Sequence, residues 1–147
     1  MNYNLVDILL VEDNPDDAEL TIRELTKHNM AHNLMHVKDG EEALDFIFCT
    51  GKYKGSREIE YLPRLMLLDI QMPKVNGIEV LEKIKSNPIT KMIPIVVLTS
   101  SNESPDIKKC YNLGANSYIV KPVNFDGFTQ AIKNIGTYWI VLNQPRI

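Results

Sequence analysis

Four short apolar runs divide the chain, and they hardly alternate with polar residues. These runs are Val6 to Val11, Leu65 to Leu68, Ile93 to Leu98 and Tyr118 to Val120. Nearly unbroken apolar runs of this length are typical of strands that are buried on both faces of a parallel sheet. A fifth, weaker strand is predicted around Asn33 to Val37.

Helical patterns separate these strands. Asn14 is the expected N-cap of the first helix, with Pro15 at its first position. Asp39 and Glu42 form a pair like a capping box at the start of the second helix, and Gly114 is the expected C-terminal cap of the fourth. The apolar positions at helical spacing are Ala18, Ile22 and Leu25; Ala43, Leu44 and Ile47; Val80, Leu81 and Ile84; Ile107, Cys110 and Tyr111; and Phe125, Phe128, Ile132, Ile135, Trp139 and Leu142.

The order along the chain is therefore strand then helix, five times over. This alternation predicts an α/β fold, with a doubly wound five-stranded parallel sheet covered by five helices. A chain of 147 residues is about one domain long. We expect one domain over residues 1–147, with its core over about 5–143 and no output domain.

Composition and charge exclude several classes of function. A net charge of −3 argues against a nucleic-acid partner, because a domain that binds the phosphates of nucleic acid usually carries a basic face. No apolar run approaches the roughly 18 residues of a membrane span, and the N-terminus does not resemble a signal peptide. Cys49 and Cys110 are too few for a disulfide framework. We expect a cytoplasmic protein with reduced thiols and no membrane partner.

Polar residues that can bind ligands or react follow the apolar runs. Glu12 and Asp13 come after the first run, and Asp69 follows the run at Leu65. Thr99 and Lys121 come after the last two runs. Ligands of open α/β sheets bind outside the carboxyl ends of the strands. We therefore expect three acids, one hydroxyl and one amine to gather at one edge of the sheet.

Such a cluster indicates a cation site and phosphoryl chemistry. Two carboxylates about 4 Å apart repel by about 4 kcal/mol at an effective dielectric near 20, so three would resist ionising together without a cation. Oxygen ligands favour Mg²⁺ over zinc. A carboxylate can attack phosphorus and form an aspartyl phosphate, with Mg²⁺ and Lys121 supplying charge and the Thr99 hydroxyl a hydrogen bond. The alternative is that these acids are only helix caps or solvated loop ends, which fits Glu12 taken alone.

The motifs around these residues resemble the receiver domains of bacterial response regulators over roughly residues 5 to 143. The matching segments are Val11-Glu12-Asp13-Asn14, Leu68-Asp69-Ile70-Gln71-Met72-Pro73, Asn76-Gly77, Leu98-Thr99-Ser100, Gly114-Ala115 and Tyr118-Ile119-Val120-Lys121-Pro122. The resemblance implies a flavodoxin-like, CheY-like sheet with strand order 2-1-3-4-5. The longer segment before the third strand resembles the small stand-alone regulators that are paired with phytochrome-type histidine kinases.

The resemblance also implies roles for the acidic residues. Asp69 would be the phosphoacceptor, and Asp13 and Asp69 would bind Mg²⁺ directly, together with the backbone carbonyl of Gln71. Glu12 would act on the metal through a water molecule; the family often has Asp at this position. The side chains of Gln71 and Ser101 lie at positions that tune hydrolysis of the phosphoaspartate in the family.

Three further roles follow from the same resemblance. Lys121 would pair with the phosphoryl group, and a cis peptide bond before Pro122 would orient it. Thr99 and Tyr118 would form the switch pair, in which the hydroxyl moves toward the phosphate and the ring turns inward. The switch would change a surface near the fourth helix and the fifth strand, by shifting the population of two states.

The expected function is that of a phosphorylated signalling module rather than an enzyme with an external substrate. Its partners would be a sensor histidine kinase or a histidine phosphotransfer protein, and a downstream protein target. A homodimer through the last helix is a further hypothesis, with Tyr138 at the interface and Trp139 packed on the sheet.

Three other functions stay open as alternatives. A phosphatase of the haloacid dehalogenase type would need an acid where Gln71 stands, and a flavin-binding protein would need a Ser-, Thr- or Gly-rich loop in place of Glu12 to Asp17. A degenerate receiver that binds partners without phosphorylation usually lacks one of the key residues. His28, His32 and His36 recur every four residues, but the strand expected near Asn33 would separate them, so a metal role is not expected.

Overall fold

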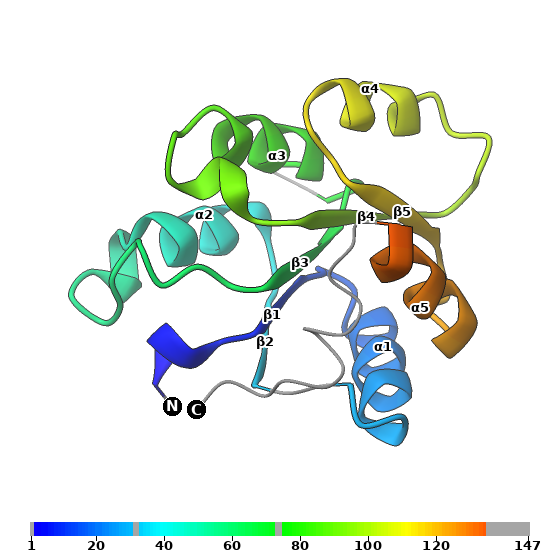
Figure 1. Cartoon of the computed structure of the whole chain (residues 1–147), viewed down its shortest axis with the longest axis horizontal. Coiled ribbons are helices and arrows are strands. Elements are labelled where there is room, and N and C mark those ends of the chain that lie inside the picture. Colours follow the sequence, from blue (N-terminus) through cyan, green and yellow to red (C-terminus); the bar gives the residue numbers. More distant parts are fainter. Residues whose placement is uncertain (1, 31–32, 73–74, 135–147) are drawn as a thin grey trace.

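A five-stranded parallel sheet forms the centre of the computed structural model, which describes residues 2–30, 33–72 and 75–134. The strand order is β2-β1-β3-β4-β5, and Figure 1 shows the helices on both faces of the sheet. The strands are β1 (Ile8–Val11), β2 (Leu34–Val37), β3 (Leu65–Asp69), β4 (Ile95–Thr99) and β5 (Ser117–Val120). The α-helices are α1 (Pro15–Lys27), α2 (Gly40–Phe48), α3 (Gly77–Lys85), α4 (Asp106–Asn112) and α5 (Phe125–Asn134). The predicted fold class and strand order are confirmed.

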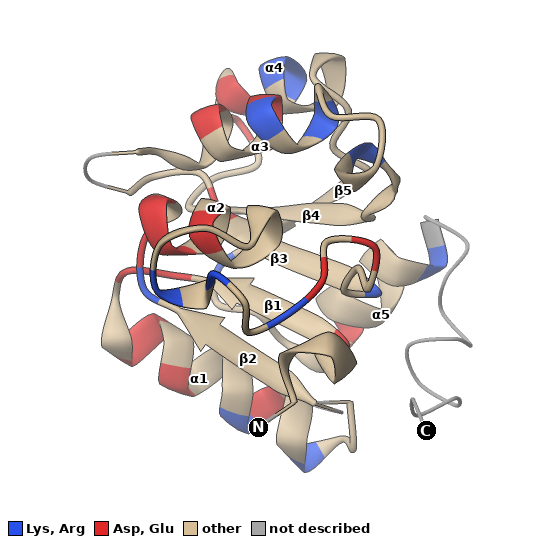
Figure 2. Ribbon diagram, turned by 90° about the vertical axis from the view of Figure 1, so that its left-hand side faces the viewer, with Lys and Arg blue, Asp and Glu red and all other residues tan. Residues whose placement is uncertain are grey.

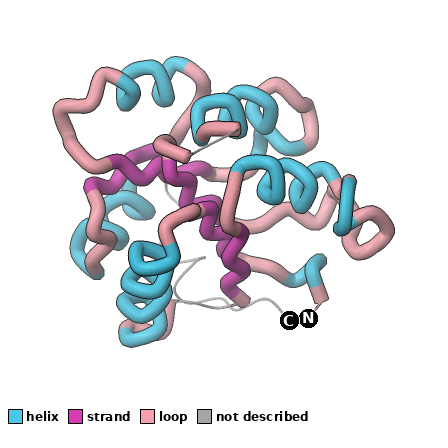
Figure 3. Tube along the Cα trace, turned by 180° about the vertical axis from the view of Figure 1, so that it is seen from behind, coloured by secondary structure: helices cyan, strands magenta, loops and turns pink. Residues whose placement is uncertain are grey.

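Each face of the sheet has its own hydrophobic core. Helices α2, α3 and α4 cover one face, and α1 and α5 cover the other (Figure 1). Within β1, Leu9 and Val11 point into the first core, while Ile8 and Leu10 point into the second. Both faces of the strand are therefore buried, which is why the apolar runs in the sequence do not alternate. Seen from behind, the helices again flank the strands on two sides (Figure 3).

The ends of the elements differ from the predicted ones by one or two residues. β4 begins at Ile95 instead of Ile93, because Pro94 has no N–H for the ladder. The predicted N-caps of α1 and α2 are confirmed: the side chain of Asn14 accepts two backbone N–H groups, and that of Asp39 accepts one. Leu113 is the C-cap of α4, and Gly114, which follows it directly, has a φ of 109°. Ile135, Trp139 and Leu142 of the predicted last helix lie outside the described residues.

The segment between α2 and β3 is anchored to the rest of the fold by two buried side chains. Arg57 is 5% exposed and donates hydrogen bonds to the carbonyl oxygens of Phe46 and Ile47, at 2.8 and 2.9 Å. Tyr53 is 4% exposed, stacks edge-to-face on Phe46 and donates its hydroxyl to Glu42. These two side chains therefore complete the core over α2.

Charged residues lie mainly on the helices and loops that surround the sheet (Figure 2). In the ranges 2–30, 33–72 and 75–134, no helix has the length and apolar character needed to cross a membrane.

Candidate functional site

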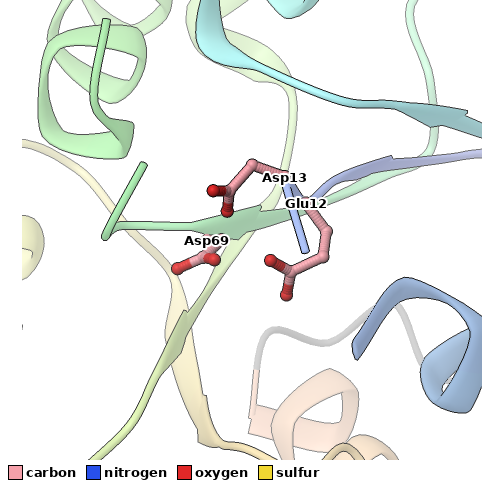
Figure 4. A group of neighbouring side chains, drawn as sticks. All are labelled: Glu12, Asp13 and Asp69. Atoms are coloured by element: carbon pink, nitrogen blue, oxygen red, sulfur yellow. The ribbon is translucent and has the colours of Figure 1, made fainter. Parts of the chain in front are cut away.

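Two neighbouring strands bring three carboxylates together. Asp69 is the last residue of β3, while Glu12 and Asp13 directly follow β1, which pairs with β3 in parallel. Oxygen atoms of the three carboxylates lie within 4.8 Å of one another, at the carboxyl edge of the sheet (Figure 4). Glu12 is fully buried and Asp69 is 2% exposed, whereas Asp13 is more open to solvent. The acids that were expected at this edge of the sheet thus form a compact group.

Lys121 supplies the positive charge of this group. Its backbone N–H donates to the carbonyl of Thr99 at 2.8 Å, which fixes the residue beyond the end of β5. Its Nζ lies 3.2 Å from a carboxylate oxygen of Asp69 and 3.1 Å from one of Glu12. The Lys121–Pro122 peptide bond is cis. One ammonium therefore bridges the acids that follow two different strands.

Burial and mutual repulsion change the ionisation of this group. Burial, together with a hydrogen bond and the charge of Asp69, raises the pKa of Glu12 from 4.5 to about 8 against the opposing effect of Lys121. Burial alone would lower the pKa of Lys121, but its hydrogen bonds to Asp17 and Glu12 and the charge of Asp69 raise it above its ordinary value. The site thus has an excess of negative charge that a further cation would relieve.

Gln71 and the start of α3 hold Asp69 in place. The backbone N–H of Gln71 donates to Oδ1 of Asp69 at 2.9 Å. A Cβ atom on Gly77 would lie 2.2 Å from the carbonyl oxygen of Asp69, so only glycine lets the first turn of α3 approach the end of β3 this closely. The expected pair Asn76-Gly77 therefore serves the site through packing: Asn76 caps α3, and Gly77 makes room for the strand.

A pocket of about 590 Å³ opens over the acidic group. Its lining residues are Asp13, Asn14, Asp17, Leu20, Asp69, Gln71, Ser100, Lys121 and Pro122. Six predicted site residues therefore meet here: Glu12 by its contact with Lys121, and Asp13, Asp69, Gln71, Lys121 and Pro122 in the lining. Asp17 was missed by sequence reasoning, although its place in the first turn of α1, just after the acids that follow β1, offered a signal.

The predicted switch residues are not part of the lining of this pocket. Thr99 is buried, and its hydroxyl lies 3.2 Å from the carbonyl oxygen of Ser101, toward which it donates. Tyr118 is partly buried and meets the ring of Tyr111 edge-to-face at 6.4 Å. The hydroxyl and the ring thus come from the neighbouring strands β4 and β5, and the ring contacts α4.

His28 and His36 make local contacts, and His32 lies outside the described residues. His36 lies 2.8 Å from the carbonyl oxygen of Glu12, and His28 pairs with Glu24 and stacks on Phe125. The group of Glu12, Asp13 and Asp69 is the one cluster among the described residues that could hold a metal ion.

Comparison with known proteins identifies the family. The family model of the response regulator receiver domain matches residues 8–133. The chain belongs to the response regulator receiver family. Its members are receivers of two-component signalling, and aspartate phosphorylation and magnesium binding are general features of the family.

Among its relatives, this receiver is 38% identical to the response regulator Rcp1 of Synechocystis sp. over 133 residues, which cover 90% of this chain and 88% of Rcp1. The solved structure of the bacteriophytochrome response regulator RtBRR is 44% identical, with a TM-score of 0.85, and the match covers 97% of this chain and 84% of that one. The phosphorylated cyanobacterial phytochrome response regulator RcpA is 38% identical, with a TM-score of 0.73, over 92% of this chain and 94% of that one.

The raised pKa of Glu12 predicts a pH dependence of stability in the metal-free receiver. Between pH 4.5 and about 8 the folded protein retains a proton that the unfolded chain releases, so the free energy of unfolding falls as the pH rises through this window. Thermal unfolding in the presence of a chelator at several pH values measures this slope. The Glu12→Gln variant is expected to have a flatter profile, and an unchanged slope in this variant would contradict the assignment.

Proposed function

We propose that this receiver accepts a phosphoryl group on Asp69 from a sensor histidine kinase or a histidine phosphotransfer protein. The observation that carries the proposal is the placement of Lys121 Nζ, 3.2 Å from the Asp69 carboxylate, with both residues in the lining of one pocket. A nucleophilic oxygen and a cation that can neutralise a phosphoryl group are thus side by side. The phosphorylated relative RcpA supports the assignment.

The donor atoms of the site fit Mg²⁺. The three carboxylates provide hard oxygen ligands at mutual distances within 4.8 Å, and a divalent cation would offset the burial and the repulsion by Asp69 that keep a proton on Glu12. Asp13, Asp69 and the backbone carbonyl of Gln71 would hold the ion directly, with Glu12 acting through a water molecule. A solved form of Rcp1, 35% identical with a TM-score of 0.72, over 97% of this chain and 98% of that one, contains Mn²⁺.

In the proposed reaction an oxygen of Asp69 attacks phosphorus as the bond from phosphorus to the donor's histidine nitrogen breaks. The donor imidazole keeps the electron pair of that bond and takes up a proton, and Asp69 becomes an acyl phosphate. Lys121 donates hydrogen bonds to the phosphoryl oxygens, and the N–H of Gln71 holds the attacking carboxylate in line. Bound Mg²⁺ would contribute the positive charge that phosphoryl transfer chiefly requires.

The readout would pass through Thr99 and Tyr118. The Thr99 hydroxyl now bonded to Ser101 would turn toward the new phosphoryl oxygens, and the Tyr118 ring would move inward from Tyr111. The surface formed by α4, β5 and α5 would then change its affinity for a downstream protein target. Gln71 and Ser101 would set the lifetime of the phosphoaspartate through the access of water.

The names of the relatives suggest where this receiver acts. Rcp1-like and bacteriophytochrome response regulators favour a phytochrome-type histidine kinase as the donor, and hence a cytoplasmic site of action. A homodimer through α5 completes the proposal. Tyr138 and Trp139, which were expected to contribute to the last helix, lie outside the described residues.

Phosphoryl uptake tests the proposal. The purified protein incubated with acetyl phosphate and Mg²⁺ is expected to gain the mass of one phosphoryl group in an intact-mass spectrum. With a chelator the gain should disappear, because the acidic group then lacks the charge that uptake requires. Unmodified protein after incubation with acetyl phosphate, and also with the kinase of its own operon or genome, would contradict the proposal.

A further inference from the structure

Lys121 has a third carboxylate partner that the family roles leave unassigned. Its Nζ lies 3.0 Å from Oδ2 of Asp17, slightly closer than its distances to Glu12 and Asp69. The side chain of Asp17 is 37% exposed and lines the pocket, whereas that of Lys121 is 19% exposed. Asp17 is therefore the more exposed of the carboxylates that meet the ammonium, whereas Glu12 is buried.

The first turn of α1 fixes the position of Asp17. The side chain of Asn14 caps the helix and accepts the N–H of Asp17 at 3.1 Å, and Pro15 occupies the first helical position. The neighbouring Asp16 belongs to the same turn, and its N–H donates to the same oxygen of Asn14. Its exposed carboxylate makes no ion pair or hydrogen bond with a described residue, so Asp16 offers a matched control of equal charge.

The three partners of Lys121 differ in what else they would bind. Glu12 and Asp69 belong to the acidic group that fits Mg²⁺, while Asp17 lies outside it. A cation among the acids would weaken the attraction of Glu12 and Asp69 for the ammonium, because their charge would be shared. Asp17 would then be the anion that still holds Lys121.

We propose that Asp17 is a positioning residue that holds Lys121 at the mouth of the pocket and competes with the incoming phosphoryl group for it. This inference rests on the proposed phosphoryl transfer to Asp69. Asp17 leaves the ammonium in reach of the pocket while Mg²⁺ enters, and it sets how readily Lys121 is released to the phosphoryl oxygens. Asp17 touches neither of the reacting atoms in this role.

Two opposite effects of the Asp17→Asn substitution follow. Without Asp17, the ammonium turns to Glu12 and Asp69, which are the carboxylates that the metal needs, so Mg²⁺ should bind more weakly. At saturating Mg²⁺ the same substitution should speed phosphoryl uptake, because Lys121 is no longer held back and one negative charge fewer faces the anionic donor. Each change is expected to be roughly twofold to fivefold, the range of a partly exposed ion pair.

The test compares Asp17→Asn with Asp16→Asn and with the conservative Asp17→Glu. Calorimetric titration gives the Mg²⁺ affinity of each variant, and quenched intact-mass samples give the rate of uptake from acetyl phosphate at saturating Mg²⁺. Asp17→Asn should bind Mg²⁺ more weakly and take up phosphoryl faster, whereas Asp16→Asn and Asp17→Glu should stay close to the parent protein. Slower uptake in Asp17→Asn, or equal changes in both asparagine variants, would overturn the proposal.

A second arm separates this inference from the proposed function. In a Lys121→Gln background, replacing Asp17 with asparagine should change the Mg²⁺ affinity no more than Asp16→Asn does, because the competing ammonium is gone. This titration needs no phosphoryl transfer. If Asp17→Asn no longer weakens Mg²⁺ binding in that background, the result would support the proposal that Asp17 holds Lys121, even if the parent protein took up no phosphoryl group. If Asp17→Asn still weakens Mg²⁺ binding there, the proposal would be overturned.

Discussion

The Asp69→Asn variant is expected to take up no phosphoryl group from acetyl phosphate, under conditions in which the parent protein is modified. The amide has no anionic oxygen with which to attack phosphorus, and it removes one carboxylate of the acidic group. The variant keeps the shape of the side chain, so the N–H of Gln71 can still donate to the oxygen at position 69. Intact-mass spectrometry of both proteins measures the difference.

Unfolding of the variant is not expected to cause this loss. Asp69 is 2% exposed beside the other acids, and removing one of several repelling carboxylates should leave the thermal unfolding temperature in chelator unchanged or higher. The Asp16→Asn variant serves as a control for the loss of one charge near the pocket, and it should be phosphorylated at the parent rate. Uptake by Asp69→Asn at that rate would place the acceptor at another acid, such as Asp13.

Replacing Lys121 with methionine is expected to slow phosphoryl uptake by about two to three orders of magnitude. The ammonium is the cation that the structure places within hydrogen-bond reach of Asp69, and methionine keeps an unbranched stem of similar length without the charge. The phosphoryl oxygens would then lose a preorganised donor in the transition state. A time course of uptake at saturating Mg²⁺ and acetyl phosphate gives the two rates.

A matched control for this lysine exists on the surface. Lys52 also pairs with a glutamate, Glu42, but it lies beside α2 with a side chain that is 66% exposed. Lys52→Met should leave the uptake rate unchanged. In chelator, Lys121→Met should also unfold at a lower temperature than the parent, because the carboxylates of Glu12, Asp17 and Asp69 lose their shared partner. Parent-like uptake in Lys121→Met would remove this lysine from the mechanism.

Much of the fold was predictable because the two cores bury both faces of the strands. Leu9 and Leu10 of β1 are both fully buried, so the apolar runs are continuous and easily recognised. The order of elements then fixes the edge of the sheet at which Asp69 and Lys121 meet, since the carboxyl ends of parallel strands lie together. The acidic group therefore followed from strand ends alone.

What the sequence did not reveal depends on side-chain direction and on contacts distant in the chain. The pairing of Asp17 with Lys121 spans 104 positions and joins the start of α1 to the end of β5, which no local pattern reports. The hydroxyl of Thr99 turns to the backbone of Ser101, a choice between rotamers that the residue type leaves open. Arg57 is buried through its bonds to the end of α2, although arginine is normally exposed.

The central claim is that Asp69 carries the phosphoryl group, and chemical mapping of the acyl phosphate tests it most directly. The parent protein, phosphorylated with acetyl phosphate and Mg²⁺, is treated with borohydride, which reduces an acyl phosphate of aspartate to homoserine. Peptide mass spectrometry then locates the reduced position. We predict homoserine at position 69 and nowhere else; a reduced residue at position 13 or 17 with an intact Asp69 would contradict the account.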